Sequence, residues 1–198
     1  MFFHKFNRLF SAKCFQTYCN APLTEEEINR TMNIYKRLGL PGCIGSVDCV
    51  HIRWERCPAG ERSQHKGKEG FPTLSYEVTV DHCKKVIAVT EGHPGVRNDK
   101  TIVKFDGFMS SIHDGNLYGD ISFELLADRS SRGDDCDINN LKNQTHTIES
   151  EEMGAYLISD GGYPKWRTLQ CPIKHTVRSK HALWSKWVES VRDPYGKM

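Results

Sequence analysis

The sequence has no apolar run that approaches the roughly 20 residues needed for a membrane-spanning helix. Its start, Met1-Phe2-Phe3-His4-Lys5-Phe6-Asn7-Arg8, interrupts the apolar stretch with charges, whereas a secretory signal keeps an unbroken apolar segment. Internal repeats and low-complexity tracts are also missing. With 38% hydrophobic and 26% charged residues over 198 positions, we expect a globular intracellular protein with a core and no association with membranes.

Metal-binding cysteine pairs are missing as well. The eight cysteines include no Cys-x-x-Cys pair, and none is followed by histidines at zinc-finger spacing. A chain of this length without a signal segment does not need disulfides to hold its fold. We therefore expect reduced, mostly buried thiols and no zinc site.

The net charge is only +2, but the charges are unevenly distributed. Residues 2–68 hold eleven Lys/Arg and six Asp/Glu. Residues 106–152 hold three Lys/Arg and eleven Asp/Glu, and residues 165–192 hold seven Lys/Arg and one Asp/Glu. Two basic flanks around an acidic middle allow two interpretations, a polyanion-binding face beside a solvated insertion or ordinary solvated surfaces. Charge alone leaves both open.

The hydrophobic periodicity predicts a mixture of helices and strands. A capping box at Thr24-Glu25-Glu26-Glu27 begins a helix that Gly39 ends. Three β-prone runs follow at 44–52, 73–80 and 86–90, and their tight last connection predicts an antiparallel meander. In the second run, apolar residues alternate strictly with polar ones, which puts its apolar side chains on one face.

The second half of the chain continues this pattern. Asn98 or Asp99 can cap a helix that carries Ile102, Phe105 and Met109. A compact apolar strand follows at 155–159, and the apolar spacing from Leu183 to Val191 predicts a closing helix. We predict an N-terminal helical segment over 1–39 and one α/β domain over 40–198, with a polar insertion at about 112–153.

Two aspartates stand out because they lie in or at the end of apolar strands. Asp48 lies within the first strand, and Asp160 follows the strand at 155–159. A carboxylate inside an apolar strand costs several kcal/mol unless it is paired or bound to a metal. A salt bridge or a turn cap explains either one alone. On neighbouring parallel strands, both would meet at one sheet edge and repel unless a divalent cation lay between them.

Three further residues are candidates near this edge. Asp99 is either a plain helix N-cap or a third metal ligand. We expect His51 on the Asp48 face of its strand, where it can contact metal-bound water or a phosphate; a core histidine is the alternative. Arg97 can clamp a phosphate oxygen, or it is an ordinary surface arginine.

A strand with an aspartate, two further strands, a helix, a strand ending in an aspartate and then helices is the plan of a ribonuclease-H-like nuclease domain. Three blocks resemble successive blocks of the PIF/Harbinger transposase-derived nucleases, most closely their plant-transposon-type branch within the DDE superfamily of endonucleases. The resemblance covers roughly Leu40 to Arg192. The blocks are Gly45-Ser46-Val47-Asp48-Cys49-Val50-His51, Gly92-x-Pro94-Gly95-x-x-Asn98-Asp99 and Leu157-Ile158-Ser159-Asp160-Gly161-Gly162-Tyr163-Pro164-Lys165-Trp166.

The resemblance implies an α/β, ribonuclease-H-like mixed sheet, an antiparallel meander plus parallel strands, flanked by helices and carrying a polar insertion. It implies that Asp48 and Asp160 are catalytic and that Asp48, Asp99 and Asp160 bind Mg²⁺ or Mn²⁺. Two such ions about 3.5–4 Å apart support in-line attack on a phosphodiester. The resemblance also implies action on double-stranded DNA, a nuclear location and a separate DNA-binding partner protein.

Both ends depart from the family pattern. The family's third catalytic acid is a glutamate on a helix beyond the second aspartate, and here that motif is replaced by Asp193-Pro194-Tyr195-Gly196-Lys197-Met198. Glu189 is the one substitute to consider. A helix-turn-helix segment usually precedes the domain, and the residues before the first block here are enough only for its last helices. Two hypotheses therefore stay open: a DNA endonuclease or transposase, and a catalytically inactive truncated relic that binds only DNA or a partner.

Overall fold

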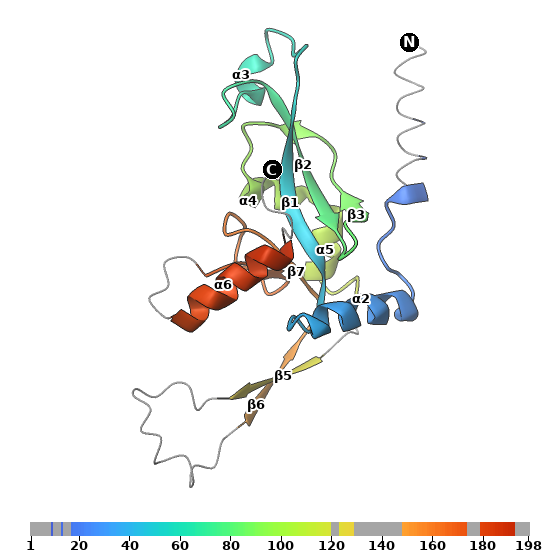
Figure 1. The fold of residues 1–198 in the computed structure, drawn as a ribbon. Helices are drawn as coiled ribbons and strands as arrows, with labels where there is room; N and C mark the ends of the chain where they lie inside the picture. The colour runs from blue at the N-terminus through green and yellow to red at the C-terminus, as the bar shows by residue number, and fades with distance from the viewer. Residues whose placement is uncertain are drawn as a thin grey trace.

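The computed structural model describes residues 9, 13, 17–119, 123–128, 148–173 and 179–192. A mixed sheet lies at the centre, helices flank it, and a separate two-stranded ribbon lies at one end (Figure 1). The sheet strands are β1 (Cys43–Arg53), β2 (Thr73–Val80), β3 (Val86–Val89), β4 (His93–Pro94), β7 (Tyr156–Ile158) and β8 (Leu169–Gln170), and the ribbon strands are β5 (Phe123–Asp128) and β6 (Ile148–Met153). The helices are α2 (Glu25–Arg37), α3 (Arg62–His65), α4 (Asp99–Ile102), the 3₁₀ helix η1 (Val103–Phe105), α5 (Gly107–His113) and α6 (Ser179–Arg192).

The order of the sheet strands is β3-β2-β1-β7-β8, with β4 paired to β2. β1, β2 and β3 form an antiparallel meander. β7 lies parallel to β1, and β8 lies parallel to β7. This order confirms the predicted α/β, ribonuclease-H-like class. Within the described part of the chain, no helix is long and apolar enough to cross a bilayer.

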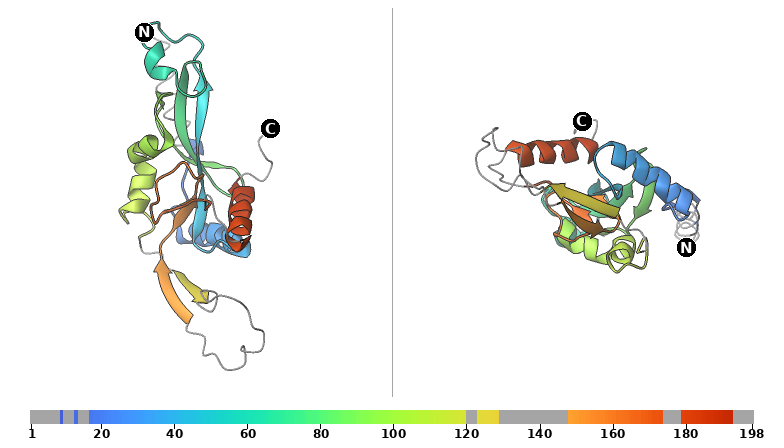
Figure 2. Two further views of the ribbon diagram at one scale, coloured as in Figure 1. Left: turned by 90° about the vertical axis from the view of Figure 1, so that its left-hand side faces the viewer. Right: turned by 90° about the horizontal axis from the view of Figure 1, so that it is seen from below.

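Each face of the sheet carries its own hydrophobic cluster. Val47 and Leu157 are fully buried on the face that α5 covers with Met109. Ile158 lies on the opposite face, against Val188 of α6. Figure 2 (left) shows α4 and α5 on one side of the sheet and α6 on the other. Because each fully buried side chain of this size stabilises the fold by about 1.5–3 kcal/mol, the middle of the sheet is a firm support for the residues at its edge.

α2 begins and ends where the sequence predicts. The Thr24 hydroxyl accepts a hydrogen bond from the Glu27 N–H (3.3 Å), and the Glu27 carboxylate accepts one from the Thr24 N–H (3.3 Å). After the C-cap Leu38, Gly39 adopts a φ of +76°, a left-handed conformation that favours glycine. The capping box is therefore confirmed as the start of this helix.

β2 alternates as predicted, but its more deeply buried face is the polar one. The apolar residues of the strand are only half-buried. The buried residues are Thr73, Ser75, Glu77 and Thr79, all at most 1% exposed. Part of this inversion has a visible cause, because Thr73 and Ser75 hydrogen-bond to His51, whereas the side chains of Glu77 and Thr79 have no hydrogen-bond partner among the described residues.

The helix predicted after Asn98 is divided into three short segments. Asn98 caps α4, with its Oδ1 accepting from the Thr101 N–H (2.9 Å). Asp106 then ends η1 and caps α5, because its Oδ1 accepts from the Phe108 and Met109 N–H groups (2.8 and 3.3 Å). An aspartate that offers its oxygen to the backbone competes with a continuous helix, so the chain restarts here.

The segment predicted as a polar insertion at about 112–153 contains an antiparallel ribbon. β5 and β6 pair along their whole length and project away from the sheet (Figure 1). The segment begins inside the core, since Tyr118 is 9% exposed and its hydroxyl donates to the Pro22 carbonyl (2.7 Å). Residues 129–147, like most positions before 17 in the predicted 1–39 segment, lie outside the described residues. The domain limits stay a prediction.

Candidate active site at the sheet edge

The parallel pairing of β1 with β7 brings two predicted site residues together. The register pairs Gly45 with Leu157 and Ser46 with Ile158. Continued by two residues, it sets Asp48 beside Asp160, just beyond the last paired residue of β7. Directly paired residues of parallel strands point to the same face, so this continuation predicts both carboxylates on the face that α6 covers.

Asp99 reaches the same edge from α4, on the other side of the sheet. A Cβ on Gly162 would stand 2.8 Å from Asp160 Oδ1 and 3.2 Å from Asp99 Oδ2. Gly162 therefore leaves room for two carboxylates where any other residue would displace one. The Gly162 N–H donates to Asp160 Oδ1 (2.6 Å), which fixes the orientation of that carboxylate.

The electrostatics of Asp48 reflect this crowding. Desolvation is the largest cause that raises its pKa above the ordinary value, and the Asp160 and Asp99 carboxylates raise it further. The Arg192 guanidinium and the Cys49 N–H, which donates to Asp48 Oδ1 (3.0 Å), lower it. The side chain of Asp48 is nevertheless 62% exposed, so water and solutes reach it.

α6 presents a cation, and not an acid, to this edge. Arg192 Nη1 lies 3.4 Å from Asp48 Oδ2, and the arginine side chain is 17% exposed. Glu189, the substitute considered for a third acid, is exposed on the same helix. Sequence analysis did not identify Arg192, because the sequence of the C-terminal helix does not indicate which side chain of its last turn contacts a strand.

The expected position of His51 is wrong. His51 and Asp48 are three residues apart on a strand, and alternation puts them on opposite faces. The structure has His51 on the Cys49 face, where its Nδ1 lies 3.1 Å from Thr73 Oγ1 and 3.0 Å from Ser75 Oγ. The proposed contact of His51 with a substrate therefore stays a prediction, and it would come from the opposite face.

Arg97 is tied to its own loop. Its Nη1 lies 2.9 Å from His93 Nδ1, and its guanidinium lies 5.0 Å from the centre of the Phe105 ring. Desolvation and the Arg97 charge lower the pKa of His93, so this histidine accepts the hydrogen bond as a neutral ring. A role for Arg97 at a phosphate stays a prediction.

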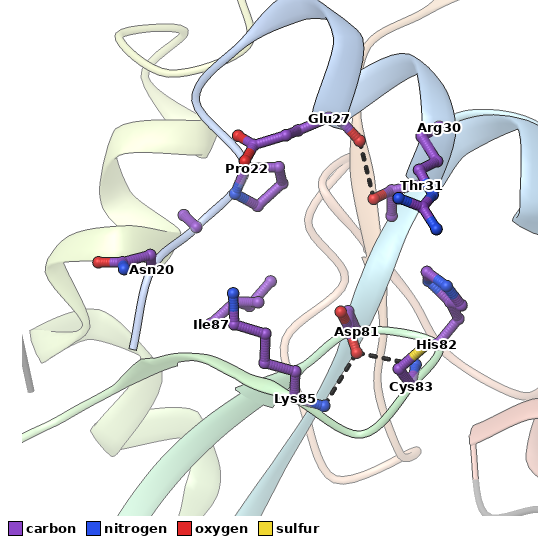
Figure 3. A pocket seen from close by; sticks show the side chains of 11 residues that line it. Asn20, Pro22, Glu27, Arg30, Thr31, Asp81, His82, Cys83, Lys85 and Ile87 are labelled. Atoms are coloured by element: carbon purple, nitrogen blue, oxygen red, sulfur yellow. Dashed lines mark hydrogen bonds between the residues drawn. The ribbon is translucent and has the colours of Figure 1, made fainter. Parts of the chain in front are cut away.

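Two groups of three side chains in the described part of the chain bring metal-ligating atoms within 4.8 Å of one another. One is Cys49, His51 and Asp99, and the other is the turn Asp81-His82-Cys83. The three predicted aspartates do not form such a tight group. The turn lines a pocket of about 400 Å³ beside α2 (Figure 3).

A buried carboxyl pair lies under the sheet beside this site, and sequence reasoning missed it. Glu77 is fully buried close to Asp106, which is 3% exposed, and neither Glu77 carboxyl oxygen nor Asp106 Oδ2 has a hydrogen-bond partner among the described residues. Desolvation, reinforced by Asp106, raises the pKa of Glu77 to about 9, so Glu77 is protonated at neutral pH. The Tyr163 hydroxyl is buried nearby, without a hydrogen-bond partner among the described residues. The only sequence signal for Glu77 was its polar position in a strand whose polar and apolar residues alternate.

The sheet order defines the class of protein, an α/β domain of ribonuclease-H-like architecture. Residues 16–129, more than half of the chain, match the family described as plant transposon protein. The chain therefore belongs to this family, and the predicted relationship to Harbinger-derived, transposase-type nucleases is confirmed.

Two curated proteins are similar to the chain. Protein ALP1-like from Arabidopsis thaliana is 26% identical over 139 residues, which cover 69% of this chain and 28% of that protein. Putative nuclease HARBI1 from Rattus norvegicus is 29% identical over 96 residues, which cover 46% of this chain and 27% of that protein. The similarity thus spans little more than a quarter of either relative. No solved structure matches the chain.

Proposed function

We propose that this chain is the core of a divalent-metal-dependent DNA endonuclease or strand transferase. The observation that carries the proposal is the parallel register of β1 and β7, which continues to Asp48 and Asp160 at one edge, with Asp99 arriving from α4. Membership of a transposase-type family and similarity to a protein named a putative nuclease support it.

The residues at the edge fit a hard divalent cation such as Mg²⁺ or Mn²⁺. Asp99 and Asp160 direct carboxylate oxygens to the space that a side chain at position 162 would fill, and such ions prefer carboxylate oxygens and water. With Asp48 they would form the ligand set. When bound, the ions would lower the pKa of an attacking water and stabilise the leaving oxygen of a phosphodiester.

Residues of the chain already orient the carboxylates at this edge before a cation binds. The Gly162 and Cys49 N–H groups hold the carboxylates of Asp160 and Asp48, so the rotation of two ligands is already restricted. Arg192 balances part of the negative charge and has to leave Asp48 when a cation takes its place. Because the pair is largely solvent-exposed on the aspartate side, this exchange costs little, up to about 1 kcal/mol.

Double-stranded DNA is the proposed substrate, with nuclear residence and a separate DNA-binding partner following from the family. The basic flanks of the sequence at 2–68 and 165–192 support attraction to a polyanion. A second function, binding of DNA or a partner without cleavage, is favoured by one specific observation. At the last turn of α6, Arg192 forms an ion pair with Asp48, and Glu189, the candidate third acid, is exposed to solvent.

Nicking of supercoiled plasmid in Mn²⁺ tests the proposal. We expect nicking by the wild type, its loss in Asp48→Asn and Asp160→Asn, and its retention in Asp114→Asn, a matched control at an exposed position. Nicking that survives both changes at the edge would refute the assignment. Absent nicking, combined with Mn²⁺ binding and DNA retention by the wild type, would favour the non-catalytic alternative.

A further inference from the structure

The face of β1 opposite Asp48 carries a second group of metal-ligating side chains. Cys49 and His51 are two residues apart, so they point to the same face of the strand. Asp99, the first residue of α4, approaches this face, and its carboxylate lies near the Cys49 thiol. The ligand atoms of the three residues all lie within 4.8 Å of one another.

The orientation of His51 is fixed by the neighbouring strand. Its Nδ1 is 3.1 Å from Thr73 Oγ1 and 3.0 Å from Ser75 Oγ, and both of these β2 residues are fully buried. Histidines that bind metals are usually held in this way through one ring nitrogen, which sets the tautomer and leaves the other nitrogen for the metal. The supporting hydrogen bonds are thus already in place.

The donor set distinguishes this site from the acidic edge. A thiolate, an imidazole and a carboxylate suit Zn²⁺, whereas Mg²⁺ prefers oxygen ligands alone. Ligand atoms bound to one zinc ion at about 2.0–2.3 Å lie roughly 3–4 Å apart, so small side-chain rotations complete the geometry. Three protein ligands leave a fourth position for water. We propose that Cys49, His51 and Asp99 bind Zn²⁺ at a site that shares Asp99 with the acidic edge and that the cysteine spacing of the sequence does not predict.

The buried hydroxyl of Tyr163 supports a polar occupant here. Desolvation is the largest cause that raises its pKa, Glu77, Cys49 and Asp99 add to the rise, and the hydroxyl has no hydrogen-bond partner among the described residues. A buried hydroxyl without a partner is costly in a folded protein. Water in the fourth coordination position of the zinc would give this hydroxyl a hydrogen-bond partner.

The Asp81-His82-Cys83 turn is the competing zinc site, and its geometry is less suitable. Asp81 Oδ1 already accepts hydrogen bonds from the Cys83 N–H (2.8 Å) and the Lys85 N–H (2.9 Å), as Figure 3 shows. Its carboxylate therefore holds the turn between β2 and β3 together. Cys83 is exposed, and this makes the turn a matched control for cysteine replacement.

Asp99 connects the two sites. Its Oδ2 faces Gly162 at the acidic edge, while the carboxylate also meets the Cys49 thiol. A zinc ion bound by Cys49, His51 and Asp99 would withdraw this carboxylate from Asp160. Zn²⁺ is therefore expected to weaken binding of Mn²⁺ at the acidic edge, and not to substitute for it.

Absorption of the Co²⁺-loaded protein tests the proposal, because cobalt replaces zinc and a bound thiolate gives a sulfur-to-cobalt charge-transfer band. With reduced protein, we expect one Co²⁺ per chain with this band in the wild type and in Cys83→Ser. In Cys49→Ser the band should disappear, and Zn²⁺ affinity measured by calorimetry should fall at least tenfold. Thr73→Val keeps all three ligands and should weaken Zn²⁺ binding about 10- to 100-fold, as losses of such supporting hydrogen bonds do.

Several results would overturn the site. They are a wild type without the thiolate band, a band that persists in Cys49→Ser, or a band that disappears in Cys83→Ser. Circular dichroism verifies that each variant is folded, and His51→Gln, which keeps the thiol, provides a second test should Cys49→Ser not fold. Asp48→Asn should retain the band even if it abolishes Mn²⁺ binding, so failure of the nuclease proposal is distinguishable from failure of this one.

Discussion

Replacing Glu77 by glutamine should remove much of the pH dependence of folding stability. Glu77 is fully buried on β2, and desolvation together with Asp106 raises its pKa from 4.5 to about 9. Between these values the native state holds a proton that the unfolded chain has lost. The stabilisation is therefore complete below about pH 4.5, falls as the pH rises, and is lost above about pH 9.

The size of the effect follows from the linkage between protonation and folding. Each pH unit inside the window changes the free energy of unfolding by up to about 1.4 kcal/mol, which gives an upper limit of about 4 kcal/mol between pH 5 and pH 8. A domain is typically stable by about 5–15 kcal/mol, so a loss of this size is readily measured. Glutamine has nearly the same shape, does not titrate, and can donate its amide N–H to Asp106.

Urea unfolding followed by tryptophan fluorescence at pH 5, 6, 7 and 8 measures this difference. The wild type should lose stability with rising pH relative to Glu77→Gln, whereas Glu55→Gln, at an exposed position, should follow the wild type. Glu55→Gln removes an exposed carboxyl in place of the buried one, so the comparison isolates the effect of Glu77 together with its neighbour Asp106. Parallel profiles for the wild type and Glu77→Gln would show that the buried carboxyl does not hold a proton.

Three further predictions concern separate parts of the molecule. Arg192→Ala removes the cation 3.4 Å from Asp48. Calorimetry should show Mn²⁺ affinity rising about two- to fivefold, in line with about 0.5–1 kcal/mol for an ion pair whose aspartate is solvent-exposed; unchanged affinity would contradict the exchange. Thr24→Ala removes the N-cap of α2 and should cost about 1 kcal/mol in urea unfolding, with Thr101→Val expected to leave α2 unaffected. Leu157→Ala, at a fully buried position of β7, should cost about 2–5 kcal/mol, and a loss below 1 kcal/mol would mean that β7 is not part of the core.

The sequence predicted the elements better than it predicted their faces. The meander, the apolar strand before Asp160 and the capped helix α2 follow from local patterns, which depend on neighbouring residues alone. The face of β2 that is buried depends on which helices cover it, and here His51 gives Thr73 and Ser75 a hydrogen-bond partner. Hydrophobic alternation cannot show that a polar face is the covered one.

The candidate site shows the same division. Asp48 and Asp160 were identified from their place on apolar strands, and the register that sets them side by side follows from parallel pairing. His51 was assigned to the wrong face, although alternation along the strand contains the right answer. Arg192 and the Glu77–Asp106 pair depend on tertiary contacts between elements distant in the chain, and the sequence offers no more than the polar position of Glu77 in an alternating strand.

Calorimetric titration with Mn²⁺ tests the central claim that Asp48 and Asp160 hold one metal site. The wild type should bind Mn²⁺, Asp114→Asn should bind it equally, and Asp48→Asn and Asp160→Asn should each weaken binding at least tenfold. In the double variant the loss should be smaller than the sum of the two single losses, since both side chains serve the same site. Identical Mn²⁺ binding by the wild type and both single variants would contradict the account.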